Sequence, residues 1–182
     1  MGRTDSPYLL ALMRIIKAIS SSRDLKEVLS RIAKSICETT GSKGCTLMLL
    51  NERDQSLEIK SSFGLSDRYV EKGPVSADRS ISDTLHGKTV IIEDAARDPR
   101  IQYPEEAKRE GVASIVSTPM ILRGTIIGVL RLYTSVPCRF TEEDIDFLSA
   151  LAIQSGLAIE NAKLHELMKT PNTKHQITDK LQ

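Results

Sequence analysis

The residues best suited to chemistry are three cysteines and three histidines: Cys37, Cys45, Cys138, His86, His165 and His175. No two histidines, and no histidine with a cysteine, have metal-ligand spacing, so we expect no metal site. Cys37 and Cys45 fall on apolar faces and are interpreted as core residues. Cys138 follows Pro137 and is expected to be exposed, which keeps a thiol redox sensor as an alternative.

The polar residues form no catalytic arrangement. No Ser/His/Asp constellation, glycine-rich phosphate loop or pair of carboxylates stands out, so we expect that the protein is not an enzyme. Asp94 and Asp98 flank a turn, and their carboxylates are expected to accept hydrogen bonds from the following backbone, with ligand contact as the alternative. Ser114 and Ser117 lie in a strand that must present one face to any pocket, and contact of Ser114 with a ligand is left open.

Composition excludes several other functions. The chain has 182 residues, enough for one domain, with 25 Lys and Arg against 24 Asp and Glu, a net charge of +1. This balance argues against direct nucleic-acid or acidic-membrane binding, because both need clustered positive charge. No run of about 18 apolar residues or secretory signal is present, and three cysteines give no disulfide framework. We therefore expect a cytoplasmic protein.

Two amphipathic helices are expected at the N-terminus. In residues 6–20, Leu9, Leu12, Ile16 and Ile19 recur at spacings of three and four, a pattern suited to packing against another helix. The second helix begins after Asp24, which can cap it, and Gly41 is a plausible stop.

Strand patterns follow. Residues 45–50 and 57–63 predict one hairpin, and residues 113–122 and 125–134 predict another. Between them lies a connection, about residues 64–112, with a short helix at 81–86, a brief strand at 89–93 and a helix at 104–110. Long connections in compact domains often cover binding sites, so this one suggests a lid over a ligand pocket.

A long last helix is expected after a capping pair, Thr141 and Asp144, and its apolar pattern persists to about Leu167. One face combines large and small residues: Leu148, Leu151, Ser155, Ala158 and Ala162. Together with the stripe of the first helix, it predicts a four-helix homodimer interface. The alternative is that both stripes are buried inside one protomer.

Several stretches together resemble a GAF domain, a sensory module: 24–29 (DLKEVL), 45–50 (CTLMLL), 92–100 (IEDAARDPR), 112–120 (VASIVSTPM), 127–132 (IGVLRL), 140–144 (FTEED) and 159–162 (IENA). The resemblance covers about residues 20–168. It implies an α+β fold with a six-stranded antiparallel sheet, terminal helices on one face and a ligand pocket under the connection on the other. Residues 1–22 would form a signalling and dimerisation helix, 23–168 the domain and 169–182 a flexible tail.

Position by position, the resemblance also implies a set of ligand-binding residues. They are Thr46, Phe63, Ile81, Ser82, Asp94, Ile101, Ala107, Val112, Ser114 and Arg131.

The sequence departs from the family's known ligand motifs. Thr134 and Ser135 stand where cyclic-nucleotide-binding members carry Asn and Lys, so a cyclic nucleotide is possible but not favoured. No cysteine precedes a histidine, as bilin attachment usually requires, and Asp98 stands where haem-binding members place a histidine. The family's free methionine-R-sulfoxide reductases need cysteines in the connection, and residues 64–112 contain none.

The sequence therefore predicts a regulatory sensor domain that binds an unidentified small molecule. It would transmit its state through the terminal helices to an output domain or a separate signalling protein. Alternatives are a ligand-free dimerisation scaffold and, less favoured, the thiol redox sensor. The sequence does not distinguish a fragment of a multidomain sensor from a stand-alone module.

Overall fold

The computed structural model describes residues 7–21, 24–51, 53–54, 56–76 and 81–169. Its helices are α1 (Pro7–Ser21), α2 (Leu25–Thr40), α3 (Asp67–Val70), α4 (Ser82–Leu85), α5 (Pro104–Glu110) and α6 (Glu142–Lys169). Its strands are β1 (Gly44–Asn51), β2 (Ser56–Phe63), β3 (Val75–Ser76), β4 (Val90–Ile92), β5 (Ser114–Leu122) and β6 (Thr125–Thr134). Residues 1–6 at the start of the expected first helix, and the tail from residue 170, lie outside the described residues.

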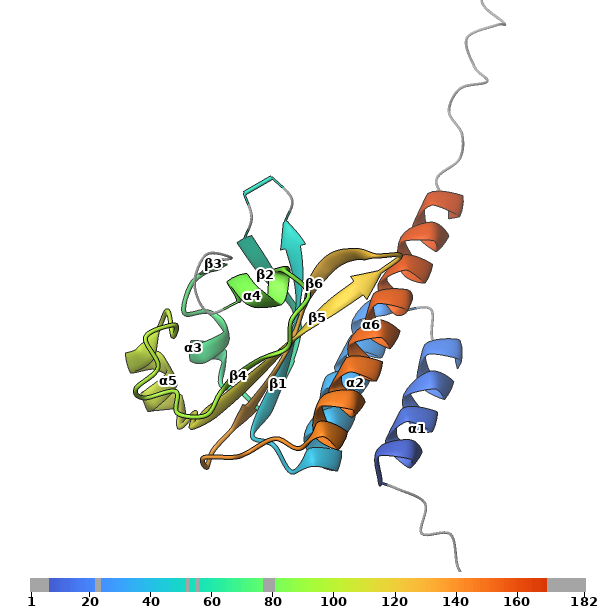
Figure 1. The fold of residues 1–182 in the computed structure, drawn as a ribbon. Helices are drawn as coiled ribbons and strands as arrows, with labels where there is room; N and C mark the ends of the chain where they lie inside the picture. Colours follow the sequence, from blue (N-terminus) through green and yellow to red (C-terminus); the bar gives the residue numbers. More distant parts are fainter. Residues whose placement is uncertain (1–6, 22–23, 52, 55, 77–80, 170–182) are drawn as a thin grey trace, which may run out of the picture.

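The strands form one antiparallel sheet in the order β3-β2-β1-β6-β5-β4. Helices α1, α2 and α6 form a layer on one side of it, and the short helices α3, α4 and α5 lie on the other (Figure 1). The expected α+β fold with a six-stranded sheet is confirmed. Helix α3 and strand β3, both in the long connection, have no counterpart among the elements expected from the residue pattern.

Local capping chemistry sets the helix boundaries as expected. The Asp24 carboxylate accepts hydrogen bonds from the backbone N–H groups of Lys26 and Glu27, which otherwise lack helical partners. Gly41 ends α2 in the left-handed conformation at φ 65°. At α6, the Asp144 carboxylate accepts from the Thr141 backbone, and the Thr141 hydroxyl accepts from the Asp144 backbone.

The largest core lies between the helix layer and the sheet. It joins buried apolar residues of α1, α2 and α6 to the helix-facing residues of β1, β5 and β6, including Ile32, Leu47, Val116 and Leu130. Each of these four is at most 1% exposed. Cys37 and Cys45 belong to this core, as expected. Among the described residues, no helix is long and apolar enough to cross a membrane.

This core corrects part of the predicted dimer interface. Leu148, Leu151 and Ser155 are fully buried and Ala158 is 6% exposed, all within one protomer. These side chains are therefore unavailable to a second copy, because the sheet and α2 already cover that face of α6. The alternative of burial inside one protomer holds for them, whereas Ala162 is only half-buried.

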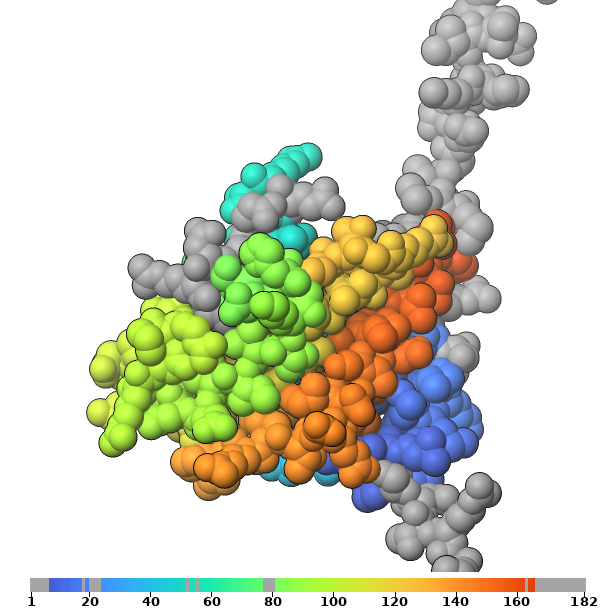
Figure 2. All heavy atoms as spheres, viewed as in Figure 1, coloured from blue at the N-terminus to red at the C-terminus, as the bar shows by residue number. Residues whose placement is uncertain are grey.

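The first helix keeps part of its apolar surface exposed. Leu12 and Ile19 pack partly against the core, but Leu9 is 49% exposed and Ile16 is 44% exposed. Exposed apolar side chains also occur at Leu10 and Met13 of α1, and at Ile153, Leu157 and Leu164 of α6. Figure 2 shows α1 and α6 as neighbours on the molecular surface.

Candidate functional site

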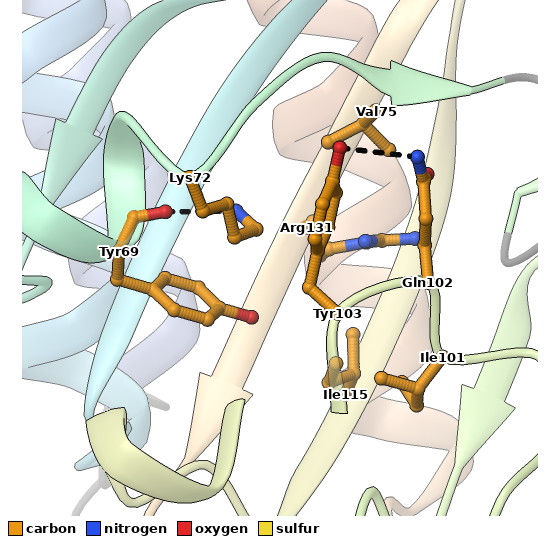
Figure 3. Close-up of a pocket in the computed structure, with 8 residues that line it drawn as sticks. All are labelled: Tyr69, Lys72, Val75, Ile101, Gln102, Tyr103, Ile115 and Arg131. Atoms are coloured by element: carbon orange, nitrogen blue, oxygen red, sulfur yellow. Dashed lines mark hydrogen bonds between the residues drawn. The ribbon is translucent and has the colours of Figure 1, made fainter. Parts of the chain in front are cut away.

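A small cavity lies on the side of the sheet opposite α6, beneath the long connection (Figure 3). Its volume is about 20 Å³, which is room for a single water-sized group. The residues around it come from α3, the segment to β3, the loop before α5, and strands β5 and β6: Tyr69, Lys72, Val75, Ile101, Gln102, Tyr103, Ile115 and Arg131.

The sheet positions Arg131 at the floor of this cavity. Arg131 lies in β6 between Thr46 of β1 and Ser117 of β5, and its side chain is buried. Its Nε donates a hydrogen bond of 2.9 Å to the Ser117 hydroxyl. Two residues further along β6, and so on the same face, the Tyr133 hydroxyl lies 3.2 Å from the Thr46 hydroxyl. The floor is therefore polar although the sheet around it is buried.

Lys72 enters the cavity from the segment after α3. Ser66 caps α3 by accepting a hydrogen bond from the Tyr69 backbone, and this places Tyr69 and Lys72 over the sheet. The Lys72 ammonium donates to the Tyr69 carbonyl at 2.9 Å and lies 3.9 Å from the Tyr69 ring centroid, a cation–π contact. Burial, and next the positive charge of Arg131, lower the pKa of Lys72 to about 8.

Gln102 and Tyr103 fasten the loop before α5 to the edge strand β3. The Gln102 amide oxygen accepts from the Ser76 backbone at 2.9 Å, and the amide nitrogen donates to the Pro74 carbonyl at 3.2 Å. The Tyr103 hydroxyl donates to the same carbonyl at 2.9 Å. Gly73, at φ 128°, permits this contact, since a Cβ atom there would lie 2.7 Å from the Tyr103 hydroxyl. The cavity is thus closed by polar bonds between two segments of the connection.

Two of the ten expected ligand residues, Ile101 and Arg131, line the cavity. Four others are buried in the same layer without lining it: Thr46, Ile81, Ala107 and Val112.

The remaining four expected ligand residues lie elsewhere. Phe63 packs against the helix-side core, and Ser82 lies in α4, where its carbonyl is 2.7 Å from His86 Nδ1. The exposed Asp94 carboxylate accepts from the Ala96 backbone, the local turn role proposed as its first interpretation. Ser114 is fully buried, and its hydroxyl bonds the Glu93 carbonyl and the Cys138 backbone.

Sequence reasoning missed six of the eight lining residues: Tyr69, Lys72, Val75, Gln102, Tyr103 and Ile115. Ser66 followed by Asp67 is a helix-capping signal that could have located α3 and thus Tyr69. Ser114 of β5 was the candidate for ligand contact, but it lies on the same strand face as Val116, which packs toward the helices. Ser117 lies on the opposite face, toward the cavity, and its hydroxyl accepts the hydrogen bond from Arg131.

The cysteines differ in accessibility. Burial raises the pKa of the Cys37 thiol to about 12 and that of Cys45 well above its ordinary value, so both stay protonated at neutral pH. Cys138 is half-buried beside a separate cavity of about 160 Å³ between the end of α2 and the start of α6. Within the described part of the chain, no group of three or more His, Cys, Asp or Glu residues could hold a metal ion.

Comparison with known proteins places this architecture in a family. Residues 22–160 match the family model described as "GAF domain". The chain is 24% identical over 168 residues to the methyl sulfide methyltransferase-associated sensor of Methanosarcina acetivorans, covering 88% of this chain and 17% of that protein. The chain spans between 13% and 23% of the length of the curated relatives that it matches.

Solved structures share the fold. The GAF domain of an Acinetobacter phosphoenolpyruvate-protein phosphotransferase superimposes with a TM-score of 0.75 at 23% identity, covering 92% of this chain and 99% of that chain. Free methionine-R-sulfoxide reductase from Neisseria meningitidis, solved with its substrate, has a TM-score of 0.74 at 20% identity, covering 91% of this chain and 96% of that chain. At these identities the likeness establishes the fold alone.

Proposed function

Since the chain belongs to the GAF domain family, whose members include regulatory sensor modules, we propose that it is a non-enzymatic sensor domain. It binds a small molecule in the cavity between Lys72 and Arg131, under the connection, and passes the state to its terminal helices. The observation that carries this proposal is the cavity itself: a polar floor within an apolar layer, closed by hydrogen bonds of Gln102 and Tyr103. A few polar groups in an apolar hollow are typical of ligand sites.

The two faces of β6 provide a route from the cavity to the helices. Arg131 faces the cavity, whereas its neighbours Leu130 and Leu132 pack into the core with Leu148 and Leu151 of α6. Because side chains alternate along a strand, a ligand that shifts Arg131 also moves residues on the helix side. Such a shift changes the helices only if the ligand prefers one of two arrangements.

The start of α6 is also linked to α1. The Tyr8 hydroxyl donates to the Asp144 carboxylate that caps α6, and the Tyr8 ring stacks on Phe147 with centroids 4.6 Å apart. A movement of α6 would therefore change how α1 is held. These terminal helices are the proposed connection to an output domain or a separate signalling protein.

Native mass spectrometry of protein purified gently from cells tests ligand binding. The expected result is an added mass that is lost on denaturation. Spin labels on exposed positions of α1 and α6 then test transmission, because occupancy is expected to change their separation. Equal distances with and without the bound molecule would contradict transmission through the helices.

The outward apolar residues of α1 and α6 support a second proposal, a homodimer in which these helices meet those of a second copy. Leu9, Met13 and Ile16 recur at spacings of four and three on α1, and Ile153 and Leu157 are one turn apart on α6. Such a stripe is suited to packing on another helix, and a self-complementary surface closes as a twofold dimer.

Two substitutions test this dimer. Met13→Glu and Leu157→Glu are expected to yield monomers in native mass spectrometry. Val136→Glu is the control, since Val136 is 65% exposed but lies outside both helices. A wild-type monomer at high concentration would exclude the dimer.

The small volume of the cavity is the observation that supports a second candidate function. In this alternative the domain is a dimerisation scaffold, and its own side chains fill the pocket. In that case no added mass is expected, even after challenge with nucleotides and metabolites.

A further inference from the structure

Two positively charged side chains reach the same cavity from different parts of the chain. Lys72 arrives from the segment after α3, and Arg131 arrives from β6 (Figure 3). The other six lining residues are neutral. Two like charges in a largely desolvated space repel each other, so this arrangement favours a bound anion between them.

The carboxylates that influence Lys72 are placed outside the cavity lining. Glu106 and Glu110, both in α5, act on Lys72 at longer range. Glu110 already accepts hydrogen bonds from the backbone and hydroxyl of Ser66, and its carboxylate lies 3.5 Å from the Lys43 ammonium. Within the described part of the chain, Lys72 forms no ion pair with a carboxylate.

Arg131 is held in an orientation suited to an oxyanion. The hydrogen bond from Nε to Ser117 fixes the plane of its guanidinium, and a planar guanidinium matches the geometry of a carboxylate. The Lys72 ammonium, held at the Tyr69 carbonyl and ring, provides a second positive charge above the floor.

We propose that this cavity binds a small monovalent oxyanion, of the carboxylate or nitrate type, between Lys72 and Arg131. The inference rests on the proposed sensor function and names the chemical class of its ligand. As the structure stands, the cavity of about 20 Å³ has room for a single water-sized group. An anion as large as acetate or nitrate therefore enters only when the bonds from Gln102 and Tyr103 to Pro74 open and the connection moves away from the floor.

Titration with sodium acetate and sodium nitrate, followed by NMR of the backbone amides, tests the proposal. Acetamide serves as the neutral isostere of acetate, and the ionic strength is kept constant with a bulky sulfonate. We expect saturable shifts with both anions, centred on the amides of residues 72, 73, 75 and 76 and of residues 101–103. Acetamide is expected to produce none.

Three variants assign the binding to the cavity. Lys72→Met is expected to weaken acetate binding about tenfold or more, because it removes one of the two charges. Lys72→Arg keeps the charge and is expected to retain most of the affinity. Lys88→Met removes an exposed lysine outside the cavity and is expected to change nothing.

The outcomes separate this inference from the sensor function. Equal binding of acetate and acetamide, or acetate binding unaffected by Lys72→Met, would overturn the anion assignment. If the NMR shifts saturate with neither anion while native mass spectrometry detects a bound molecule of another chemical class, the anion proposal is wrong and the proposed sensor function is retained. If no added mass appears either, both proposals fail.

Discussion

The two faces of the sheet are built differently. On the helix side, buried residues of three helices and three strands form one continuous apolar core. On the cavity side, two smaller clusters, one around Tyr133 and one around Met48, accompany the buried polar side chains of Thr46, Ser117 and Arg131. Continuous apolar burial stabilises the fold, whereas buried polar groups cost free energy unless they have partners. The helix side therefore supplies most of the apolar burial, and the cavity side holds the buried polar groups on which the proposed ligand binding depends.

Substitution within the sheet, where β6 lies against β1, is expected to cost more stability than substitution on either face. At Gly128 in β6 an added Cβ atom would lie 2.1 Å from the Met48 carbonyl oxygen of β1. Because that contact is with backbone, Gly128→Ala must separate the two central strands, and we expect a loss above about 4 kcal/mol in unfolding free energy. Urea denaturation measures it. Gly124→Ala is the control, since its added Cβ meets nothing within 4 Å, although its positive φ predicts a loss of about 1 kcal/mol.

Adjacent residues of β1 compare the two faces directly. Leu47 is fully buried in the helix-side core, and Met48 is fully buried in a small cavity-side cluster. Truncation of a buried Leu or Met to Ala costs about 2–5 kcal/mol. We expect the loss of unfolding free energy to lie near the upper end of this range for Leu47→Ala and near the lower end for Met48→Ala, as measured by urea denaturation. Equal losses in the two variants would contradict the conclusion that the helix side contributes more stability than the cavity side.

Tyr8→Phe tests how firmly α1 joins the helix side. The variant keeps the stacking on Phe147 but loses the hydrogen bond to Asp144, and we expect a loss of about 1 kcal/mol. That hydrogen bond, and next burial, raise the pKa of Tyr8 to about 12. Because this pKa is higher in the folded state than in the unfolded chain, the Tyr8 hydroxyl stabilises the fold fully below pH 10. This stabilisation disappears as the pH rises through about 12. Hydrogen exchange of the α1 amides measures both effects.

Lys72→Met should have the smallest effect on stability. The folded-state pKa of Lys72 is about 8, below its ordinary value of 10.5, with Arg131, Glu106, Glu110 and the Tyr69 ring around it. Between these pH values the unfolded chain binds more protons, so wild-type stability gains from this residue as the pH rises from 8 to 10.5. We expect Lys72→Met to be neutral or stabilising by at most about 1 kcal/mol at pH 7. A marked loss of unfolding free energy in Lys72→Met would contradict the inference that burial of this charge destabilises the fold.

Much of the fold could be predicted from the sequence because its signals are local. Asp24 and Gly41 mark the ends of α2. Apolar runs, alternating with polar residues in 57–63, mark the four long strands. Glycine inside a strand pattern, as at Gly128, is likewise a local signal of a close backbone approach or a bulge, and in the structure the Met48 carbonyl lies against this position. The candidate site was predicted far less completely. Ile101 and Arg131 were named, but Lys72 and Gln102 reach the cavity through α3 and β3, which are too short for a periodic signal.

The sequence by itself determined the order of the main elements, the family and the burial of Cys37 and Cys45, because caps, periodicity and motifs act over a few residues. Only the tertiary structure decided which face each strand residue occupies and which face of α6 is used internally. A shift of one residue exchanges the two faces of a strand, as Ser114 and Ser117 illustrate. The pairing of Lys72 with Arg131, 59 positions apart in the sequence, likewise depends on how the connection folds back over the sheet.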